Sequence, residues 1–177
     1  MILINNISFR RLKETDFKLL HKWLNTNFVT EWYNKGGSSY ENIVNKYLPK
    51  IKGEQPTHSF VIVCDNKDIG YIQTYRLDDY PEYSGYVNTD EPAAGLDLFI
   101  GEMDYIHKGL GKQILYKFLT DYVFLINVVD CCIIGPEPKN EIAIKAYEKV
   151  GFRYYKTIQL PDEDEPEYLM RIYKKNM

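Results

Sequence analysis

The sequence is poor in the residues that cross-link a protein or bind metals. It contains three cysteines, Cys64, Cys131 and Cys132, and three histidines. An odd number of cysteines, two of them adjacent, fits neither a disulfide framework nor a metal knuckle, and the histidines lack the spacing of metal ligands. We therefore expect no disulfide, no metal site and a location in the reducing cytoplasm.

Long apolar runs and a basic surface are missing as well. Residues 1–5 are too short and too uncharged for a signal peptide, and no apolar run is long enough to span a membrane. The net charge is −3, which predicts neither a membrane nor a nucleic-acid partner. The 177 residues contain no linker or repeat, so we expect one domain over residues 1–177.

Charged residues are segregated along the chain. Residues 77–105 contain eight acids and no Lys or Arg, and residues 157–170 contain five acids and no base. Residues 106–119 carry three lysines and no acid. This pattern predicts one anion-binding and one cation-binding region, and the alternative is that the acidic runs are solvated loops.

Strand and helix patterns alternate, which favours a mixed α/β sheet. We expect strands over residues 7–11, 58–64, 69–75, 95–100, 130–134, 152–160 and 168–173. Helices are expected over residues 15–24, 38–48 and 140–150, and after the glycines at 109 and 111. Pro49 is expected to end the second helix, and the tyrosine-rich residues 80–92 to be irregular.

The glycine-opened helix carries the first chemical signal. Gly109 and Gly111 lie between Lys108 and Lys112 at its start, although glycine costs helix stability. The N-terminus of a helix presents unpaired N–H groups that can hold a phosphate, and glycine permits close approach to the backbone. The plain alternative is a tight strand-to-helix turn, because G-x-G alone is weak evidence.

A second motif, "NEIAIKAYEKVGF" over residues 140–152, gives the first one a context. Asn140, Ala143, Tyr147 and Gly151 follow the spacing N-x-x-A-x-x-x-Y-x-x-x-G, which puts Ala143 and Tyr147 on one helix face. Together the two motifs resemble the GNAT N-acetyltransferase superfamily. Ile106 departs from the Gln or Arg that usually opens the family's glycine motif.

The resemblance implies a fold and a cosubstrate. The GNAT fold is α/β (α+β), with a mixed, mostly antiparallel central sheet flanked by helices, and its splayed strands hold acetyl-CoA. Carried over residue by residue, the cofactor-binding positions are Leu98, Phe99, Ile100, His107, Lys108, Gly109, Leu110, Gly111, Lys112, Asn140, Ala143 and Tyr147.

Five further segments narrow the resemblance to the aminoglycoside 6'-N-acetyltransferases. They are "VTEWYNKGG", "YLPKI", "IGYIQTYRL", "GLDLFIGE" and "AIKAYEKVGF", in the order seen in that subfamily. The subfamily usually has an Asp-Pro after the strand before the tyrosine helix, whereas this chain has Gly135 and Pro136. A second acid tied to substrate is therefore missing there, and Glu137 is a candidate to replace it.

The resemblance also assigns catalytic roles. Asp97 would place the acceptor amine and accept its proton, which matters because an alkylamine with a pKa of ~10.4 is mostly protonated at neutral pH. Tyr147 would donate a proton to the leaving thiolate. The plain alternatives are a structural ion pair for Asp97 and core packing for Tyr147. A backbone N–H near Phe99 or Ile100 would stabilise the thioester oxygen.

A polycationic acceptor needs acids and aromatic faces. The expected substrate-binding residues are Trp32, Tyr33, Gln73, Tyr75, Asp78, Asp79, Glu91, Asp97, Glu137, Asp162 and Asp164. We expect an antibiotic-resistance enzyme that is a monomer or homodimer and acetylates the 6'-amino group of aminoglycosides. The alternatives are a GNAT enzyme for a siderophore lysine or a protein amine, and a non-catalytic acyl-CoA sensor, which the presence of Asp97 and Tyr147 disfavours.

Overall fold

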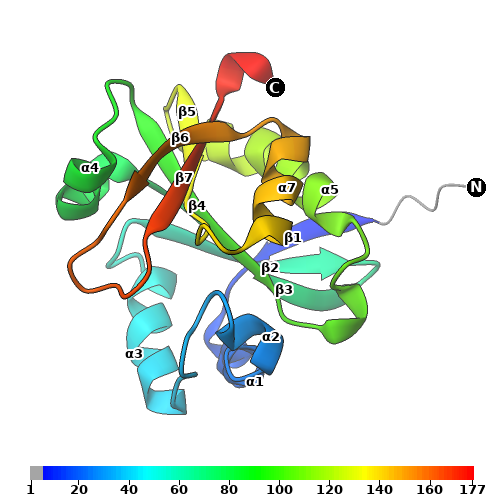
Figure 1. Ribbon diagram of the computed structural model, residues 1–177. Helices are drawn as coiled ribbons and strands as arrows, with labels where there is room; N and C mark the ends of the chain where they lie inside the picture. Colours follow the sequence, from blue (N-terminus) through cyan, green and yellow to red (C-terminus); the bar gives the residue numbers. More distant parts are fainter. Residues whose placement is uncertain (1–5) are drawn as a thin grey trace, which may run out of the picture. The chain divides into compact units, whose positions relative to one another are not determined.

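The computed structural model describes residues 6–177, so the N-terminal residues 1–5 lie outside it (Figure 1). The strands are β1 (Ile7–Arg11), β2 (Thr57–Cys64), β3 (Lys67–Arg76), β4 (Ala93–Ile100), β5 (Cys131–Ile134), β6 (Arg153–Ile158) and β7 (Glu167–Tyr173). The helices are α1 (Phe17–Trp23), α2 (Asn27–Thr30), α3 (Tyr40–Ile51), α4 (Pro81–Val87), α5 (Leu110–Phe118), α6 (Phe124–Ile126) and α7 (Glu141–Val150). A π-helical segment, Leu119–Val123, joins α5 to α6.

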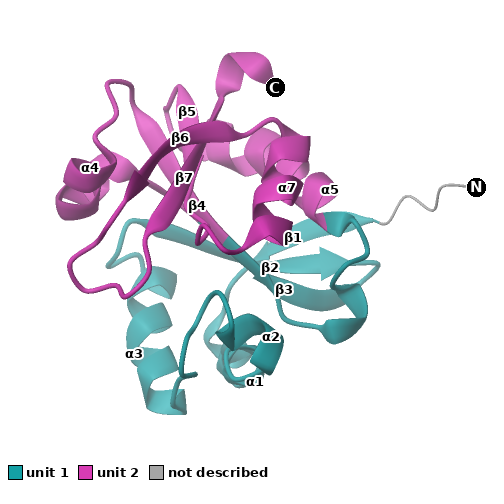
Figure 2. Ribbon diagram, in the orientation of Figure 1, with its two compact units in different colours: residues 1–73, 98–110 teal, residues 74–97, 111–177 magenta. Residues whose placement is uncertain are grey.

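The seven strands form one open sheet in the order β1-β2-β3-β4-β5-β7-β6. The β4–β5 pair is parallel, whereas β1–β2, β5–β7 and β6–β7 are antiparallel. The predicted mixed α/β sheet is confirmed. The chain groups into two compact units, residues 1–73 with 98–110 (unit 1) and residues 74–97 with 111–177 (unit 2), and Figure 2 shows that β3 and β4 each contribute to both.

Unit 1 is built on helix α1 and its apolar face. Phe17, Leu20, Trp23 and Leu24, whose helical spacing predicts this helix, are all buried. They join a core in which Phe99 of β4 packs edge-on to the ring of Trp23. The sequence pattern therefore predicts both the helix and its buried face correctly.

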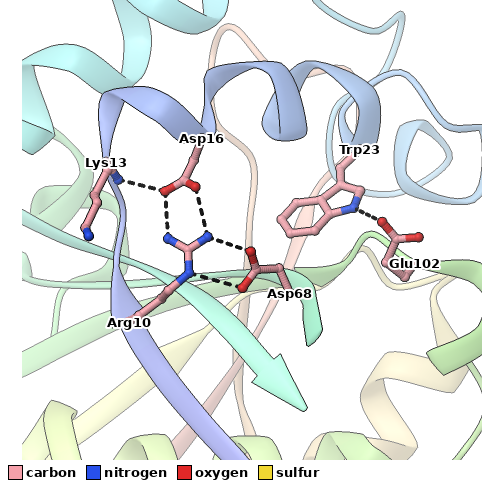
Figure 3. Close-up of polar contacts among 6 residues, drawn as sticks. All are labelled: Arg10, Lys13, Asp16, Trp23, Asp68 and Glu102. Atoms are coloured by element: carbon pink, nitrogen blue, oxygen red, sulfur yellow. Dashed lines mark hydrogen bonds and ion pairs between the residues drawn. The ribbon is translucent and has the colours of Figure 1, made fainter. Parts of the chain in front are cut away.

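An ion-pair network fixes the entry to α1 (Figure 3). Arg10 on β1 donates two hydrogen bonds of 2.8 Å to the carboxylate of Asp16, and its guanidinium also bonds both oxygens of Asp68. Asp16 accepts a further bond from the backbone N–H of Lys13. Burial opposes ionisation of Asp16, but these bonds outweigh it and hold the pKa of its carboxyl below the usual value. Asp16 thus ties α1 to β1, and its side chain makes no cap bond to the helix.

Unit 2 contains the parallel strand pair and helix α7. Its core is formed by buried residues that include Leu77, Val87, Ile133 and Leu169. The β4–β5 ladder pairs Ala93, Ala94 and Gly95 with residues 131–133, and Gly95 is its last paired residue within residues 6–177. Beyond Gly95, β4 therefore runs on without β5 as a partner, which is the interruption that the resemblance implies.

Helix α7 is capped at both ends. The side chain of Asn140 accepts a hydrogen bond of 3.2 Å from the backbone N–H of Ala143, which satisfies one of the unpaired donors of the first turn. Gly151 ends the helix with a φ of 124°, a conformation that residues with side chains rarely adopt. The motif that carries the resemblance therefore has a clear structural role at both ends of the helix.

Two expectations about local structure are wrong. Helix α3 does not stop before Pro49 but continues to Ile51, because Pro49 lies in the last turn and Gly53, at a φ of 74°, ends the helix. Residues 80–92 are not irregular, since α4 occupies 81–87. Pro81 opens α4 and Asn88 closes it in the left-handed conformation, two signals that the tyrosine-rich composition obscures.

Candidate active site

Asp97 lies on β4 two residues beyond the end of the β4–β5 ladder, in unit 2. Its neighbour on the same face of the strand is Gly95, and the ring of Tyr75 covers the place where a side chain at Gly95 would lie. Asp97 is half-buried and has interactions of its own. A carboxylate thus lies on β4 beyond its pairing with β5, on the strand face that the ring of Tyr75 covers at Gly95.

Other titratable side chains of unit 2 lie near Asp97. Burial, and then the charge of Asp97, raise the pKa of Tyr75 well above its usual value. The same two causes raise the pKa of Tyr147. Two tyrosines that the sequence assigns to the site therefore share an electrostatic environment with the expected proton acceptor.

Tyr147 lies on α7, one turn after Ala143. It is partly buried, and its ring lies 6.2 Å from that of Phe152. Like an ordinary tyrosine, the phenol is protonated at neutral pH, and burial and the charge of Asp97 raise its pKa further. Within unit 2, Tyr147 therefore has the protonation state that a general acid needs.

The glycine-opened turn has the backbone that the sequence predicts. Helix α5 begins at Leu110, and the turn before it contains two residues in the left-handed region, His107 at a φ of 57° and Gly109 at 74°. His107, Lys108, Gly109 and Lys112 are exposed. A Cβ added at Gly109 would meet nothing within 4 Å, so the backbone here is open to a ligand. Such a turn fits a phosphate, since the first N–H groups of a helix have no intrahelical acceptor.

Several expected substrate acids are already engaged in unit 2. Glu91 pairs with Arg171 at 3.5 Å and accepts a hydrogen bond of 2.9 Å from the hydroxyl of Tyr173. Asp78 pairs with Arg76 at 3.5 Å. An acid that is neutralised by arginine adds little attraction for a cationic acceptor, so Glu91 and Asp78 are weak candidates.

The remaining candidates of unit 2 differ in burial. Asp79, Asp162 and Asp164 are exposed, and Glu137 is half-buried. Cys131 and Cys132 are fully buried, and burial raises the pKa of both thiols, to about 11 for Cys131. Such thiols are poor nucleophiles, because the thiolate is the reactive form.

The candidates of unit 1 differ in their surroundings. Tyr33 packs edge-on to Phe99, with ring centres 4.7 Å apart, while Trp32 is 36% exposed. Gln73 accepts hydrogen bonds from Lys50 at 2.8 Å and from the hydroxyl of Tyr71 at 2.7 Å. Its carbonyl group is therefore committed to positioning neighbours within unit 1. Leu98 and Ile100 are half-buried on the same strand as Phe99.

The pairing of Tyr83 with Glu167 is not evident from the sequence. The hydroxyl of Tyr83 on α4 donates a hydrogen bond of 2.8 Å to Oε2 of Glu167 on β7. Burial is the main cause that raises the pKa of Glu167 to about 7, and Tyr83 partly opposes it, whereas the charges of Asp97 and Glu163 add to it. No motif marks this pair, because the two residues are 84 positions apart in the chain.

Two further properties concern the described residues alone. Within residues 6–177, no group of three or more His, Cys, Asp or Glu side chains is arranged to hold a metal ion. In the same range, every helix is too short or too polar to cross a bilayer.

Known proteins resemble this chain along most of its length. An aminoglycoside N(6')-acetyltransferase type 1 from Klebsiella pneumoniae is 26% identical over 160 residues, which cover 89% of this chain and 79% of that protein. The crystal structure of an aminoglycoside acetyltransferase in complex with coenzyme A and kanamycin superposes with a TM-score of 0.79 at 24% identity, over 96% of both chains.

A second aminoglycoside N-acetyltransferase structure is 26% identical, with a TM-score of 0.74, and covers 96% of this chain and 98% of its own. These likenesses confirm the fold that the resemblance implies. The family described as "Acetyltransferase (GNAT) domain" matches residues 13–160, which is most of the sequence. The chain belongs to the GNAT acetyltransferase family.

Proposed function

We propose that this chain transfers the acetyl group of acetyl-CoA to the 6'-amino group of an aminoglycoside. The match of residues 13–160 to the GNAT acetyltransferase family carries the proposal. Within unit 2, Asp97 on β4 and Tyr147 on α7 are the proposed proton acceptor and proton donor, and the charge of Asp97 contributes to the raised pKa of Tyr147. The relatives named as aminoglycoside N(6')-acetyltransferases, and the related structure with coenzyme A and kanamycin, support this choice of substrates.

The two side chains have complementary tasks. An ammonium group with a pKa of ~10.4 must lose its proton before it can attack, which costs roughly 4–5 kcal/mol at neutral pH. Asp97 holds the ammonium by charge and takes the proton, directly or through water. Tyr147 keeps its own proton until a thiolate forms, and then supplies it. No covalent enzyme intermediate is needed.

Acetyl-CoA supplies the activated acetyl thioester. The exposed turn of residues 107–112 fits its pyrophosphate, with backbone N–H groups and the charges of Lys108 and Lys112 as ligands. Asn140 and Ala143 fix the start of α7 and thereby the position of Tyr147. A backbone N–H near Phe99 or Ile100 is the proposed donor to the thioester oxygen, and Leu98 is proposed to contact acetyl-CoA on the same strand.

An acidic, aromatic surface suits a polycationic acceptor. In unit 2, the charge of Asp97 contributes to the raised pKa of Tyr75, and Asp162 and Asp164 are exposed. Trp32 and Tyr33 remain proposed ring-binding residues of unit 1. The three cysteines are free and buried, which suits the proposed cytoplasmic location, and we propose a monomer or homodimer.

A thiol-release assay with an acceptor panel tests the proposal. The wild-type protein is mixed with acetyl-CoA and, in turn, kanamycin, tobramycin, a lysine derivative and a peptide with a free N-terminus. We expect thiol release with the aminoglycosides and little with the other two. Release with the lysine derivative or the peptide alone would replace the aminoglycoside assignment, and no release with any acceptor would contradict acetyl transfer to these amines.

A further inference from the structure

Gly135, the residue after β5, has no side chain, and the carboxylate of Glu167 on β7 occupies the space where one would lie. β5 and β7 are antiparallel with Ile134 opposite Met170, so Gly135 follows directly at the end of this ladder. The backbone N–H of Tyr168 continues the pairing with a 2.8 Å hydrogen bond to the carbonyl oxygen of Pro136. Glu167, the first residue of β7, therefore starts beside Gly135 and Pro136.

The space around Gly135 is occupied by Glu167. A Cβ built on Gly135 would lie 2.7 Å from Oε2 of Glu167 and 3.0 Å from Cδ2 of Leu169. Contacts this short are incompatible with any side chain at position 135 while Glu167 keeps its place. The φ of Gly135 is not in the left-handed region, so the backbone itself would accept another residue. The carboxylate of Glu167 and a side chain at 135 are therefore alternatives for the same space.

A hydrogen bond fixes the orientation of the Glu167 carboxylate, which has no positively charged partner among the described residues. The hydroxyl of Tyr83 donates to its Oε2 at 2.8 Å. In the part of the chain that the structure describes, no Lys or Arg forms an ion pair with it, and the charges of Asp97 and Glu163 disfavour its ionisation. Two neighbouring carboxylates, partly removed from water, attract a cation strongly because it relieves their repulsion.

We propose that Glu167 is a specificity-determining residue of the acceptor site, where it binds a second ammonium group of the substrate beside Asp97. This inference rests on the proposed function. It identifies Glu167, rather than Glu137, as the replacement for the acid that the resemblance leads us to expect at position 135. The missing side chain of Gly135 is the feature that admits Glu167.

A charge-removing variant tests this role. Glu167→Gln keeps the shape and an oxygen that accepts the hydrogen bond of Tyr83, but it removes the charge. We expect the KM for kanamycin to rise by about tenfold, while the KM for acetyl-CoA changes by less than about twofold. The matched control is Glu148→Gln, an exposed carboxylate on α7, which should leave both constants unchanged. A kanamycin KM for Glu167→Gln within about twofold of the wild type would overturn the proposal.

Moving the carboxylate from position 167 to position 135 tests whether the two positions can serve the same purpose. Glu167→Ala alone and Gly135→Asp alone should each raise the KM for kanamycin, the first by lost charge and the second by crowding two carboxylates. The double variant should lie closer to the wild type than Glu167→Ala does, because the carboxylate introduced by Gly135→Asp then has room. A double variant whose KM for kanamycin is as high as that of Glu167→Ala would contradict the idea that the two carboxylates can replace each other. If the variants with Gly135→Asp do not fold, the KM of Glu167→Gln decides whether the proposal holds.

The wild-type protein separates this proposal from the proposed function. A wild type that acetylates kanamycin, with an unaffected Glu167→Gln variant, overturns only the role of Glu167. A wild type that neither binds kanamycin in calorimetry nor acetylates it overturns the proposed function, and the role of Glu167 with it.

Discussion

Tyr83 donates a 2.8 Å hydrogen bond to Glu167, and this bond does not prevent the pKa of Glu167 from rising to about 7. Burial outweighs the bond, and the charges of Asp97 and Glu163 add to burial. The carboxyl group is therefore half-protonated near neutral pH in the folded protein, although it would ionise near its ordinary pKa of 4.5 in the unfolded chain.

This difference predicts a pH-dependent effect of Glu167→Gln on stability. A carboxyl whose folded pKa is raised destabilises the fold progressively as pH rises from about 4.5 to about 7, because the unfolded chain ionises first. The free energy of unfolding of the variant, relative to the wild type, should therefore increase by about 2 kcal/mol over this range, less than the full shift because the side chain is partly exposed. Urea titrations at several pH values measure it, and a pH-independent difference would contradict the raised pKa.

The Arg10 network predicts the opposite pH dependence. Arg10→Met removes the partner of Asp16 and Asp68, and we expect a loss of about 2–3 kcal/mol in the free energy of unfolding at neutral pH. The folded pKa of Asp16 is lowered, so the stabilisation is present above its unfolded value of 3.8 and is lost as pH falls through the folded pKa. The loss should thus shrink in acid.

An exposed ion pair provides the control for this prediction. Lys117 and Asp121 lie one helical turn apart with a contact of 2.8 Å, and both are well exposed. Lys117→Met should cost only about 0.5 kcal/mol at neutral pH. Equal losses for Arg10→Met and Lys117→Met in thermal or urea unfolding would show that the Arg10 network adds nothing beyond a surface pair.

The open turn before α5 predicts a binding effect without a folding effect. Gly109→Leu should raise the dissociation constant for coenzyme A by about tenfold or more, because the side chain covers the backbone that we assign to the pyrophosphate. Gly53→Leu is a matched control, since Gly53 has the same φ of 74° and equally open surroundings. Both variants bear the same backbone strain, so calorimetry with coenzyme A should separate them, and equal affinities would place the pyrophosphate elsewhere.

Tyr147→Phe should lower kcat by roughly 100-fold and change the dissociation constant for acetyl-CoA by less than about twofold. The removed hydroxyl acts only when the thiolate forms, so its loss affects the transition state rather than binding. Tyr154→Phe, on an exposed tyrosine of β6, is the control and should leave kcat unchanged. Steady-state kinetics measure kcat, and calorimetry measures the dissociation constant for acetyl-CoA. A kcat of Tyr147→Phe equal to that of the wild type would mean that Tyr147 has only a packing role.

Local sequence signals predict the features that depend on near neighbours. The apolar spacing around Trp23 predicts α1 and its buried face, and the pattern of residues 140–150 predicts α7. The roles of Asp97 and Tyr147 come from a family resemblance, and their proximity within unit 2 agrees with that assignment. Short-range rules are enough for the helices, because helix periodicity and capping are set within a few residues.

The contact of Glu167 with Gly135 could not be predicted, because it depends on strand register. The contact between Gly135 and Glu167 exists only when β5 and β7 pair with Ile134 opposite Met170. The ion pair of Glu91 with Arg171 could not be predicted for the same reason, since it joins residues that are remote in the chain. Charge runs in a sequence give the number of acids but not the partners that the fold provides for each.

The position of the transferred acetyl group, measured for the wild type and for Asp97→Asn, tests the central claim most directly. NMR of kanamycin after reaction with acetyl-CoA should show acetylation at the 6'-amino group. Asp97→Asn should bind acetyl-CoA normally and turn over roughly 100-fold more slowly, because the proton acceptor is gone. Acetylation at another amine, no product at all, or an Asp97→Asn variant as fast as the wild type would contradict the account.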